Sequence, residues 1–179
     1  MTQNPSSNPQ DKQGNNEQPL PIINTLQELF PGAIEEVTVF RGETTIVVPV
    51  DRLIDIARTL RDNPAMQFNY LVDVTAVDWM GRTPRFDVVY HLYSIPLNHA
   101  IRMKVRVDDG QHVPSLTGLW ELANWGERET YDMFGIVFDG HPDLRRILLP
   151  EDWQDGFPLR KDFPIGGYGI WAAENVPFR

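Results

Sequence analysis

The sequence contains no cysteine. Disulfide bonds, thiolate nucleophiles and cysteine-held iron–sulfur clusters are therefore excluded, because each of them needs a thiol. No run of residues approaches the ~20 apolar side chains that a membrane-spanning helix requires. The N-terminus also lacks the basic segment followed by an apolar segment that marks a secretory signal. We therefore expect a soluble, cytoplasmic chain.

Basic residues are few. Lys and Arg together number 16 against 25 Asp and Glu, which gives a formal net charge of −9. Such a chain repels phosphate backbones and anionic lipid headgroups. We accordingly expect no nucleic-acid partner and no direct contact with lipid.

Composition divides the chain into three parts. Residues 1–21 are mostly Asn, Gln, Ser, Pro and charged residues, which cannot bury enough apolar surface to order, so we expect a disordered N-terminal arm. Residues 22–149 carry most of the apolar side chains and are long enough for one core. Residues 150–179 are rich in Pro, Gly and aromatic residues without a helical or strand period, which indicates an extended C-terminal tail.

Local signals within residues 22–149 predict helices and strands. Asn24 is a candidate N-cap for a short helix that Pro31-Gly32 ends, and Asp51 is a candidate N-cap for a helix that ends near Asn63. Segments rich in β-branched or alternating apolar residues predict strands at 34–40, 44–50, 68–79, 85–94 and 99–108. The expected fold class is α+β, a single domain with a mixed, mostly antiparallel sheet of about five strands covered by helices, plus the extended tail.

The last predicted strand alternates apolar and basic residues. Its basic side chains, Arg102, Lys104 and Arg106, should share one face of the sheet. We interpret them as a stripe that faces solvent or a partner.

A cluster of charged residues follows at 124–146. Asn124 and Glu127 have the spacing of a capping box, and they predict a helix over 125–134 that Gly135 ends in a left-handed conformation. Arg128 and Asp132 are four residues apart, so an ion pair on the helix surface is the simplest interpretation of these two charges. The other charges are then expected to face solvent or a partner.

The same cluster permits a second interpretation. Glu127, Glu129, Asp132 and His141 would be candidate ligands or acid–base groups of a free-standing metal-dependent hydrolase, with the aromatic tail as a lid. However, the four histidines, His91, His99, His112 and His141, form no pair at the i, i+4 spacing of a helical zinc site. A third interpretation is a stand-alone peptide-binding module with the tail as a tether.

One long window carries a family resemblance. Residues 127–153, ERETYDMFGIVFDGHPDLRRILLPEDW, resemble the signature of the thirty-kilodalton subunit family of respiratory complex I, and PLRKDFP at 158–164 matches a further run of that family. The positions that carry the resemblance or that we expect at an interface are Glu127, Arg128, Glu129, Tyr131, Asp132, Gly135, His141, Pro142, Arg145, Arg146, Trp153, Arg160 and Lys161.

The resemblance implies a role inside a large assembly. Members of this family lie in the peripheral arm of the proton-translocating NADH:quinone oxidoreductase, beside the quinone-reducing subunit of the forty-nine-kilodalton type and the iron–sulfur subunits. FMN, iron–sulfur clusters and quinone belong to those partners, so we expect no catalytic, cofactor-binding or metal-binding residue in this chain. It would lie on the cytoplasmic face of the cell membrane and contact the membrane only through other subunits. Related subunits serve ferredoxin-linked complexes and membrane-bound hydrogenases, which leaves the electron donor open.

The tail and a basic cluster complete these expectations. Arg145, Arg146, Arg160 and Lys161 form a basic island in an acidic chain, suited to an acidic partner surface. Aromatic residues and Arg anchor interfaces, so we expect residues 150–179 to lie over a neighbouring subunit; the alternative is that they wrap their own domain. Gly166-Gly167-Tyr168-Gly169 lacks the strand-turn-helix context of a phosphate-binding loop and indicates a turn.

Overall fold

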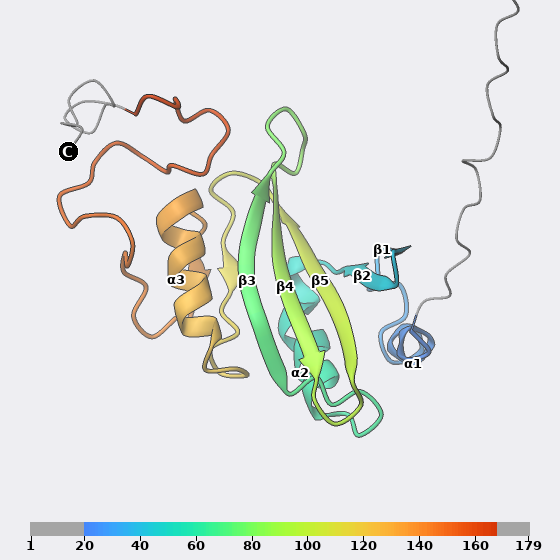
Figure 1. Cartoon of the computed structure of the whole chain (residues 1–179). Helices are drawn as coiled ribbons and strands as arrows, with labels where there is room; N and C mark the ends of the chain where they lie inside the picture. The colour runs from blue at the N-terminus through green and yellow to red at the C-terminus, as the bar shows by residue number, and fades with distance from the viewer. Residues whose placement is uncertain (1–19, 168–179) are drawn as a thin grey trace, which may run out of the picture.

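The computed structural model describes residues 20–167. Residues 1–19 of the predicted arm and residues 168–179 of the predicted tail lie outside the described residues. A mixed five-stranded sheet organises the rest, with the strand order β1-β2-β5-β4-β3 (Figure 1). Its strands are β1 Glu36–Phe40, β2 Glu43–Val47, β3 Tyr70–Asp78, β4 Phe86–Ser94 and β5 His99–Val107. The predicted fold class is confirmed.

Three hairpin-type pairings and one crossover build this sheet. β1 with β2, β3 with β4, and β4 with β5 pair antiparallel, as expected for neighbours joined by short turns. β2 pairs parallel with β5, and the chain between them contains α2 Leu53–Asp62. The short strands β6 Val113–Pro114 and β7 Phe138–Asp139 form a separate parallel pair.

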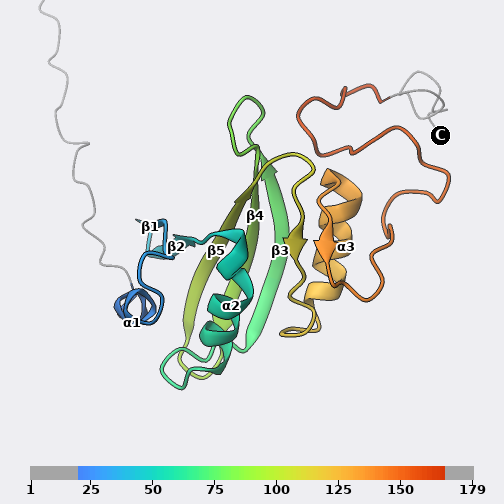
Figure 2. The same cartoon turned by 180° about the vertical axis from the view of Figure 1, so that it is seen from behind.

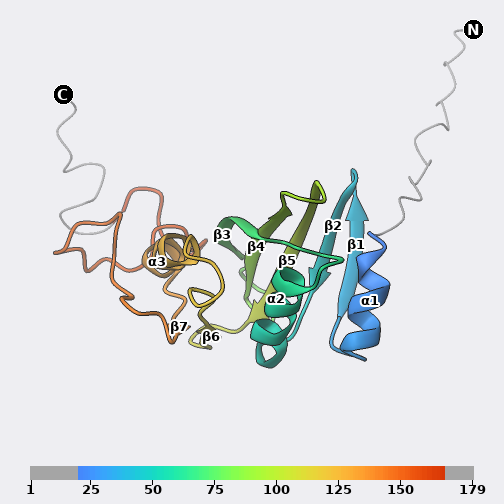
Figure 3. The same ribbon diagram turned by 90° about the horizontal axis from the view of Figure 1, so that it is seen from below.

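Two helices lie on one side of the sheet. Figure 2, the view from behind, shows α2 in front of the sheet, and Figure 3 shows α1 Ile22–Leu29 beside β1 on the same side of the sheet as α2. Leu53, Ile56 and Leu60 of α2 are fully buried, and they join one core with Met103 and Val105 of β5. The amphipathic spacing of α2 therefore places its apolar face on the sheet.

Both predicted N-caps are wrong. α1 begins at Ile22, two residues before Asn24, because Ile22 and Ile23 are buried and the Ile23 amide donates to the Leu20 carbonyl at 2.9 Å. A short 3-10 helix, η1 Val50–Arg52, precedes α2, so Asp51 lies inside that turn and makes no cap hydrogen bond. In both cases burial of apolar side chains sets the helix start.

The opposite face of the sheet, here called the open face, has no helix over it in the described part of the chain (Figure 3). The alternation predicted for β5 is confirmed: Ile101, Met103, Val105 and Val107 are buried in the core, whereas Arg102, Lys104 and Arg106 are half-buried on the open face. Opposite them in register lie His91, Val89 and Asp87 of β4. Within residues 20–167, no helix is long and apolar enough to cross a membrane.

Candidate functional site

The charged cluster lies on and after α3 Ala123–Phe134, which runs beside the edge strand β3 (Figure 1). Gly126 permits this close approach, because a Cβ atom there would lie 2.8 Å from the Cβ of Val74. Thr130 Oγ1 donates to the Gly126 carbonyl at 2.8 Å and lies 3.3 Å from the Val74 carbonyl. The absence of a side chain at Gly126 therefore lets α3 pack closely on β3, and the Thr130 hydroxyl lies within hydrogen-bonding distance of the strand.

Glu127 is fully buried and holds the loop before the helix. Its Oε1 accepts from the Leu116 amide at 2.7 Å, and its Oε2 accepts from Ser115 Oγ at 2.6 Å. Burial raises the pKa of this carboxyl to about 7, although both hydrogen bonds favour the charged form. The predicted capping box is therefore wrong: α3 begins at Ala123 with no side-chain cap, and Glu127 bonds a different segment.

Arg128 and Asp132 do not pair with each other, contrary to prediction. Arg128 Nε donates to the Arg145 carbonyl at 3.0 Å, and Nη2 lies 3.4 Å from the Arg146 carbonyl. Asp132 Oδ2 accepts from the amides of Ile147, Leu148 and Leu149 at 3.1, 2.8 and 2.9 Å.

These contacts form what we call the clamp, in which Arg128 and Asp132 hold the backbone of residues 145–149. Arg128 donates to two carbonyls of this segment, and Asp132, one helical turn later, accepts from the next three amides. Both side chains are buried, with Asp132 at 0% and Arg128 at 5% exposure, so neither lies on the helix surface where their ion pair was predicted. The other charges were expected to face solvent or a partner, which is wrong for buried Glu127 and agrees with exposed Glu129. Charged groups in this environment are tolerated because their hydrogen-bonding capacity is used.

The remaining signature residues have varied surroundings. Glu129 and Pro142 are exposed, and Tyr131 is half-buried. His141 Nδ1 accepts from the Asp143 amide at 3.0 Å, which leaves Nε2 to donate to the Asn124 carbonyl at 3.1 Å. Glu129 is thus the signature carboxylate of α3 that lies at the surface.

Gly135 ends α3 as predicted, in a left-handed conformation with φ of 75°. A second constraint acts on the same residue, since a Cβ atom at Gly135 would lie 2.4 Å from the ring of Phe157. The helix end and the tail therefore meet at a position that only glycine fits.

The hydrolase interpretation needs its four residues to converge. Glu127 bonds residues 115 and 116, Asp132 bonds residues 147–149, and His141 bonds Asn124 and Asp143. No group of three or more His, Cys, Asp or Glu side chains in the described residues could hold a metal ion. The three buried or half-buried side chains are instead bonded to separate parts of the backbone.

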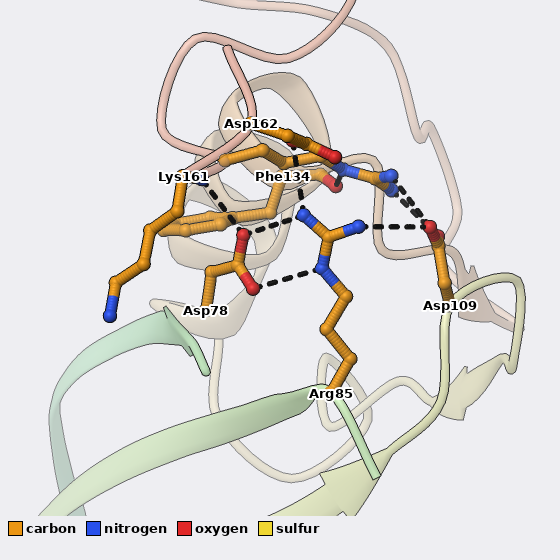
Figure 4. A network of polar contacts seen from close by, with 7 residues as sticks. Asp78, Arg85, Asp109, Phe134, Lys161 and Asp162 are labelled. Carbon is orange, nitrogen blue, oxygen red and sulfur yellow. Dashed lines mark hydrogen bonds and ion pairs between the residues drawn. The ribbon is translucent and has the colours of Figure 1, made fainter. Parts of the chain in front are cut away.

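A second polar network, which we call the latch, fixes the described part of the tail (Figure 4). Arg85 Nε and Nη2 donate to the two carboxylate oxygens of Asp78 at 2.9 and 2.7 Å, and Arg85 Nη2 also lies 3.0 Å from Asp162. The Lys161 amide donates to Asp78 Oδ2 at 2.8 Å. Hydrogen bonding to Arg85 lowers the pKa of Asp78, and the same bond raises the pKa of Arg85.

Arg160 supplies the rest of the latch. Its Nη1 and Nη2 both donate to Asp109 at 2.9 Å, and its Nε donates to the Phe134 carbonyl at 2.6 Å (Figure 4). Its guanidinium carbon also lies 4.7 Å from the centre of the Phe157 ring and 5.2 Å from that of Phe86. Residues 157–162 thereby contact β3, β4 and the end of α3.

The basic island is distributed over different environments. Arg146 lies 5.8 Å from the Phe157 ring centre, so the structure brings it to the same ring as Arg160. Arg145 is exposed and pairs with Asp143 at 2.8 Å, and Lys161 is exposed with its amine 5.7 Å from the Trp79 ring centre.

The aromatic residues of the tail also contact one another, since the Trp153 ring stacks on the Phe163 ring with 6.1 Å between the ring centres. The described residues of the tail thus contact their own domain.

Sequence reasoning did not find Asp78, Arg85 or Asp109. These residues lie far from residues 160–162 in the sequence, and nothing in their spacing indicates contact. One available signal was the pair of opposite charges on the two sides of the turn between the predicted strands at 68–79 and 85–94, Asp78 and Arg85.

Comparisons with known proteins agree with this architecture. Residues 46–169 match the family described as "Respiratory-chain NADH dehydrogenase, 30 Kd subunit". The chain is 51% identical over 158 residues to the C subunit of NADH-quinone oxidoreductase from Roseiflexus sp. (strain RS-1), covering 88% of this chain and 87% of that one. It is 50% identical over 156 residues to a protein of Rhizobium etli (strain CIAT 652) that has the same name with the number 2 added, covering 85% and 83%.

Two solved structures share the fold. A trypsin-resistant fragment of Nqo5 has a TM-score of 0.59 and 34% identity, covering 69% of this chain and 98% of the fragment. A chain of a membrane-bound sulfane sulfur reductase, an archaeal respiratory membrane complex, has a TM-score of 0.62 and 26% identity, covering 80% and 84%. With its signature residues on α3 and in the clamp, the chain therefore belongs to the thirty-kilodalton subunit family of the respiratory-chain NADH dehydrogenase.

Proposed function

We propose that this chain is a structural subunit of the peripheral arm of a proton-translocating NADH:quinone oxidoreductase. It holds the quinone-reducing subunit of the forty-nine-kilodalton type and the iron–sulfur subunits in register, and it carries no redox centre itself. FMN, iron–sulfur clusters and quinone belong to the partner subunits, which also attach the chain to the cytoplasmic face of the membrane.

The buried signature side chains carry this proposal. Glu127, Arg128 and Asp132 use their hydrogen bonds mainly on the backbone of their own chain. Side chains that act on a substrate keep an open donor, acceptor or coordination position beside a cleft, whereas these three shape a surface. The family membership and the names of the relatives support the same conclusion.

The tail and the exposed signature residues are the proposed contacts with partners. Exposed Glu129 and Pro142, together with residues 150–179, would meet neighbouring subunits. The latch holds residues 157–162 in place before binding, which lowers the conformational entropy that the tail loses when a partner docks.

The test is purification of the tagged chain from solubilised native membranes, with mass spectrometry of the copurifying chains and an NADH-to-quinone assay. We expect the quinone-reducing and iron–sulfur subunits to copurify with activity. Recovery of the tagged chain alone would contradict the proposal.

Two truncations locate the contact within the tail. A chain that ends at Gly167 keeps every residue of the latch, whereas a chain that ends at Pro150 loses Arg160 and Asp162. We expect the chain that ends at Pro150 to fold and to lose its assembled partners. Full assembly of the chain that ends at Gly167 would place the contact within residues 151–167. Full assembly of both truncated chains would refute the proposed role of the tail.

The electron donor is a separate question, because the sulfane sulfur reductase chain has a similar fold. In the same preparation, activity with NADH supports the proposed complex. Activity with reduced ferredoxin and none with NADH would assign the chain to the equivalent subunit of a ferredoxin-linked complex.

A further inference from the structure

A buried carboxylate lies where the open face meets the β3–β4 turn. Asp87 has a side chain only 3% exposed, and its Oδ2 accepts from Trp79 Nε1 at 3.0 Å. Arg82 donates to its other oxygen, and Lys104 Nζ lies 3.7 Å from Oδ2. Asp87 therefore fixes an aromatic ring and two cations in one place.

The Trp79 ring is in turn flanked by two cations. The Arg82 guanidinium carbon lies 5.1 Å from the ring centre, and the Lys161 amine lies 5.7 Å from it. Trp79 remains 42% exposed, and its neighbours Met80 and Val77 are 57% and 37% exposed. We call this surface the cationic patch; it consists of Val77, Trp79, Met80, Arg82, Lys104 and Lys161.

Segments distant in sequence build the patch before any partner binds. Asp78 ends β3 and accepts a hydrogen bond from the amide of Lys161 (Figure 4). The latch therefore positions the Lys161 side chain, whose amine lies 5.7 Å from the Trp79 ring centre. Lys104 lies on β5, at the centre of the sheet. A surface held by strands and buried hydrogen bonds loses little freedom on binding.

Charge identifies the kind of partner. Arg106 Nε also lies 3.9 Å from Asp87 Oδ1, but Arg106 pairs more closely with Glu36, at 2.6 Å. Three further cations, Arg82, Lys104 and Lys161, lie around Asp87 and the ring that it holds. This positive excess lies on a chain whose net charge is −9. Arg, Trp and Met are also the residue types enriched in protein interfaces.

We propose that the cationic patch docks an acidic segment of a neighbouring subunit, an inference that rests on the proposed function. Carboxylates of that segment pair with Lys104, Lys161 and Arg82, and an apolar side chain packs on Trp79 and Met80. A protein partner is favoured over an anionic bilayer, because the overall charge of the chain repels such a surface. This docking surface lies on the sheet and is separate from α3.

Photo-crosslinking of the assembled complex tests the proposal. The photoreactive residue p-benzoylphenylalanine replaces Met80, whose exposed side chain leaves the network around Asp87 intact. The matched control places it at Ile95, which is 61% exposed in the β4–β5 turn at the opposite end of the same strands (Figure 1). Illuminated complex is digested, and the peptide joined to position 80 is sequenced.

We expect position 80 to capture a peptide of another subunit that contains Asp or Glu beside an aromatic or aliphatic residue, and position 95 not to capture it. Capture of lipid, of residues 1–19 of this chain, or of no protein would overturn the proposal. If the complex copurifies and position 80 captures nothing, only the patch is refuted; if nothing copurifies, the proposed function itself fails.

A charge variant gives an independent readout. Lys161→Glu keeps the latch, because Asp78 accepts from the backbone amide and not from the amine. We expect a several-fold loss of the position-80 cross-link in Lys161→Glu and its retention in Lys161→Arg. Equal cross-linking in Lys161→Glu and Lys161→Arg would show that the positive charge of Lys161 does not contribute to partner binding.

Discussion

The two halves of the molecule are stabilised differently. Residues 22–107 form a sheet and two helices around an apolar core that includes Leu60, Met103 and Tyr90. Residues 108–167 add Leu116, Trp120 and Phe134 to the same core, but they depend in addition on buried charges that bond the backbone, in the clamp and in the latch. Apolar packing tolerates exchange of one side chain for a similar one, whereas a charge that serves several amides has no substitute. The second half is therefore expected to be the more sensitive to single polar substitutions.

The largest effect should come from Asp132→Ala. The substitution leaves the amides of Ile147, Leu148 and Leu149 without their acceptor, and it removes the carboxylate that lies 3.5 Å from half-buried Arg146. We expect a loss of about 4 kcal/mol in the free energy of unfolding. Urea denaturation measures the loss, and hydrogen exchange should show it concentrated in residues 140–167.

Leu60→Ala is the matched control from the other half. It removes a fully buried side chain of the apolar core and should cost about 3 kcal/mol. Amide hydrogen exchange in Leu60→Ala should become faster across the whole sheet. If both variants show the same exchange pattern, the two halves unfold as one unit and the comparison fails.

Glu127 should make stability depend on pH. Its pKa in the folded chain is raised from 4.5 to about 7, so the folded state holds a proton that the unfolded chain releases. Stability should therefore be greatest below pH 4.5 as far as this group is concerned, and it should fall by about 3 kcal/mol as the pH rises through 7. Urea midpoints across this range in wild type and Glu127→Gln test the effect.

The Gln variant keeps an acceptor for the Leu116 amide and cannot ionise, so its stability should lack this dependence on pH, called the slope below. Glu129→Gln, an exposed carboxylate on the same helix, should retain the slope. An unchanged slope in Glu127→Gln would mean that another group titrates.

Arg85→Ala should have a smaller effect, about 2 kcal/mol, because Asp78 keeps the Lys161 amide and because Arg85 is partly exposed. Since Arg85 lowers the pKa of Asp78, this stabilisation is present above the unfolded pKa of 3.8 and is lost as the pH falls below it. Limited proteolysis at neutral pH should cleave the variant within residues 150–167. Protection equal to wild type would show that Arg160 alone secures the tail.

Glu129→Ala should change stability by less than about 0.5 kcal/mol, because the side chain is exposed. We expect it to reduce copurification of partner subunits nonetheless. Glu28→Ala, an exposed carboxylate on α1 outside the signature, is the control and should leave copurification unchanged. If partner subunits copurify with both variants at wild-type levels, Glu129 is not one of the proposed contacts.

The same division explains what could be predicted from sequence. The strands at 36–40, 43–47, 70–78, 86–94 and 99–107 follow from alternation and turn residues, which are local properties. The predicted Arg128–Asp132 pair and the capping box failed because local spacing cannot show that a distant backbone segment competes for the same side chains. Asp78 and Lys161, 83 residues apart, meet only after the whole fold is known.

The clamp also affects how the chain is made. The sheet and α2 leave the ribosome first, whereas the amides of residues 147–149 that Asp132 needs are synthesised later. Until they emerge, the carboxylate of Asp132 has to remain hydrated, and α3 cannot settle against β3 without burying an unpaired charge. A prematurely terminated product thus exposes the edge strand β3 to other chains and to proteases. Synthesis past these residues is in this way a condition for the release of a stable subunit.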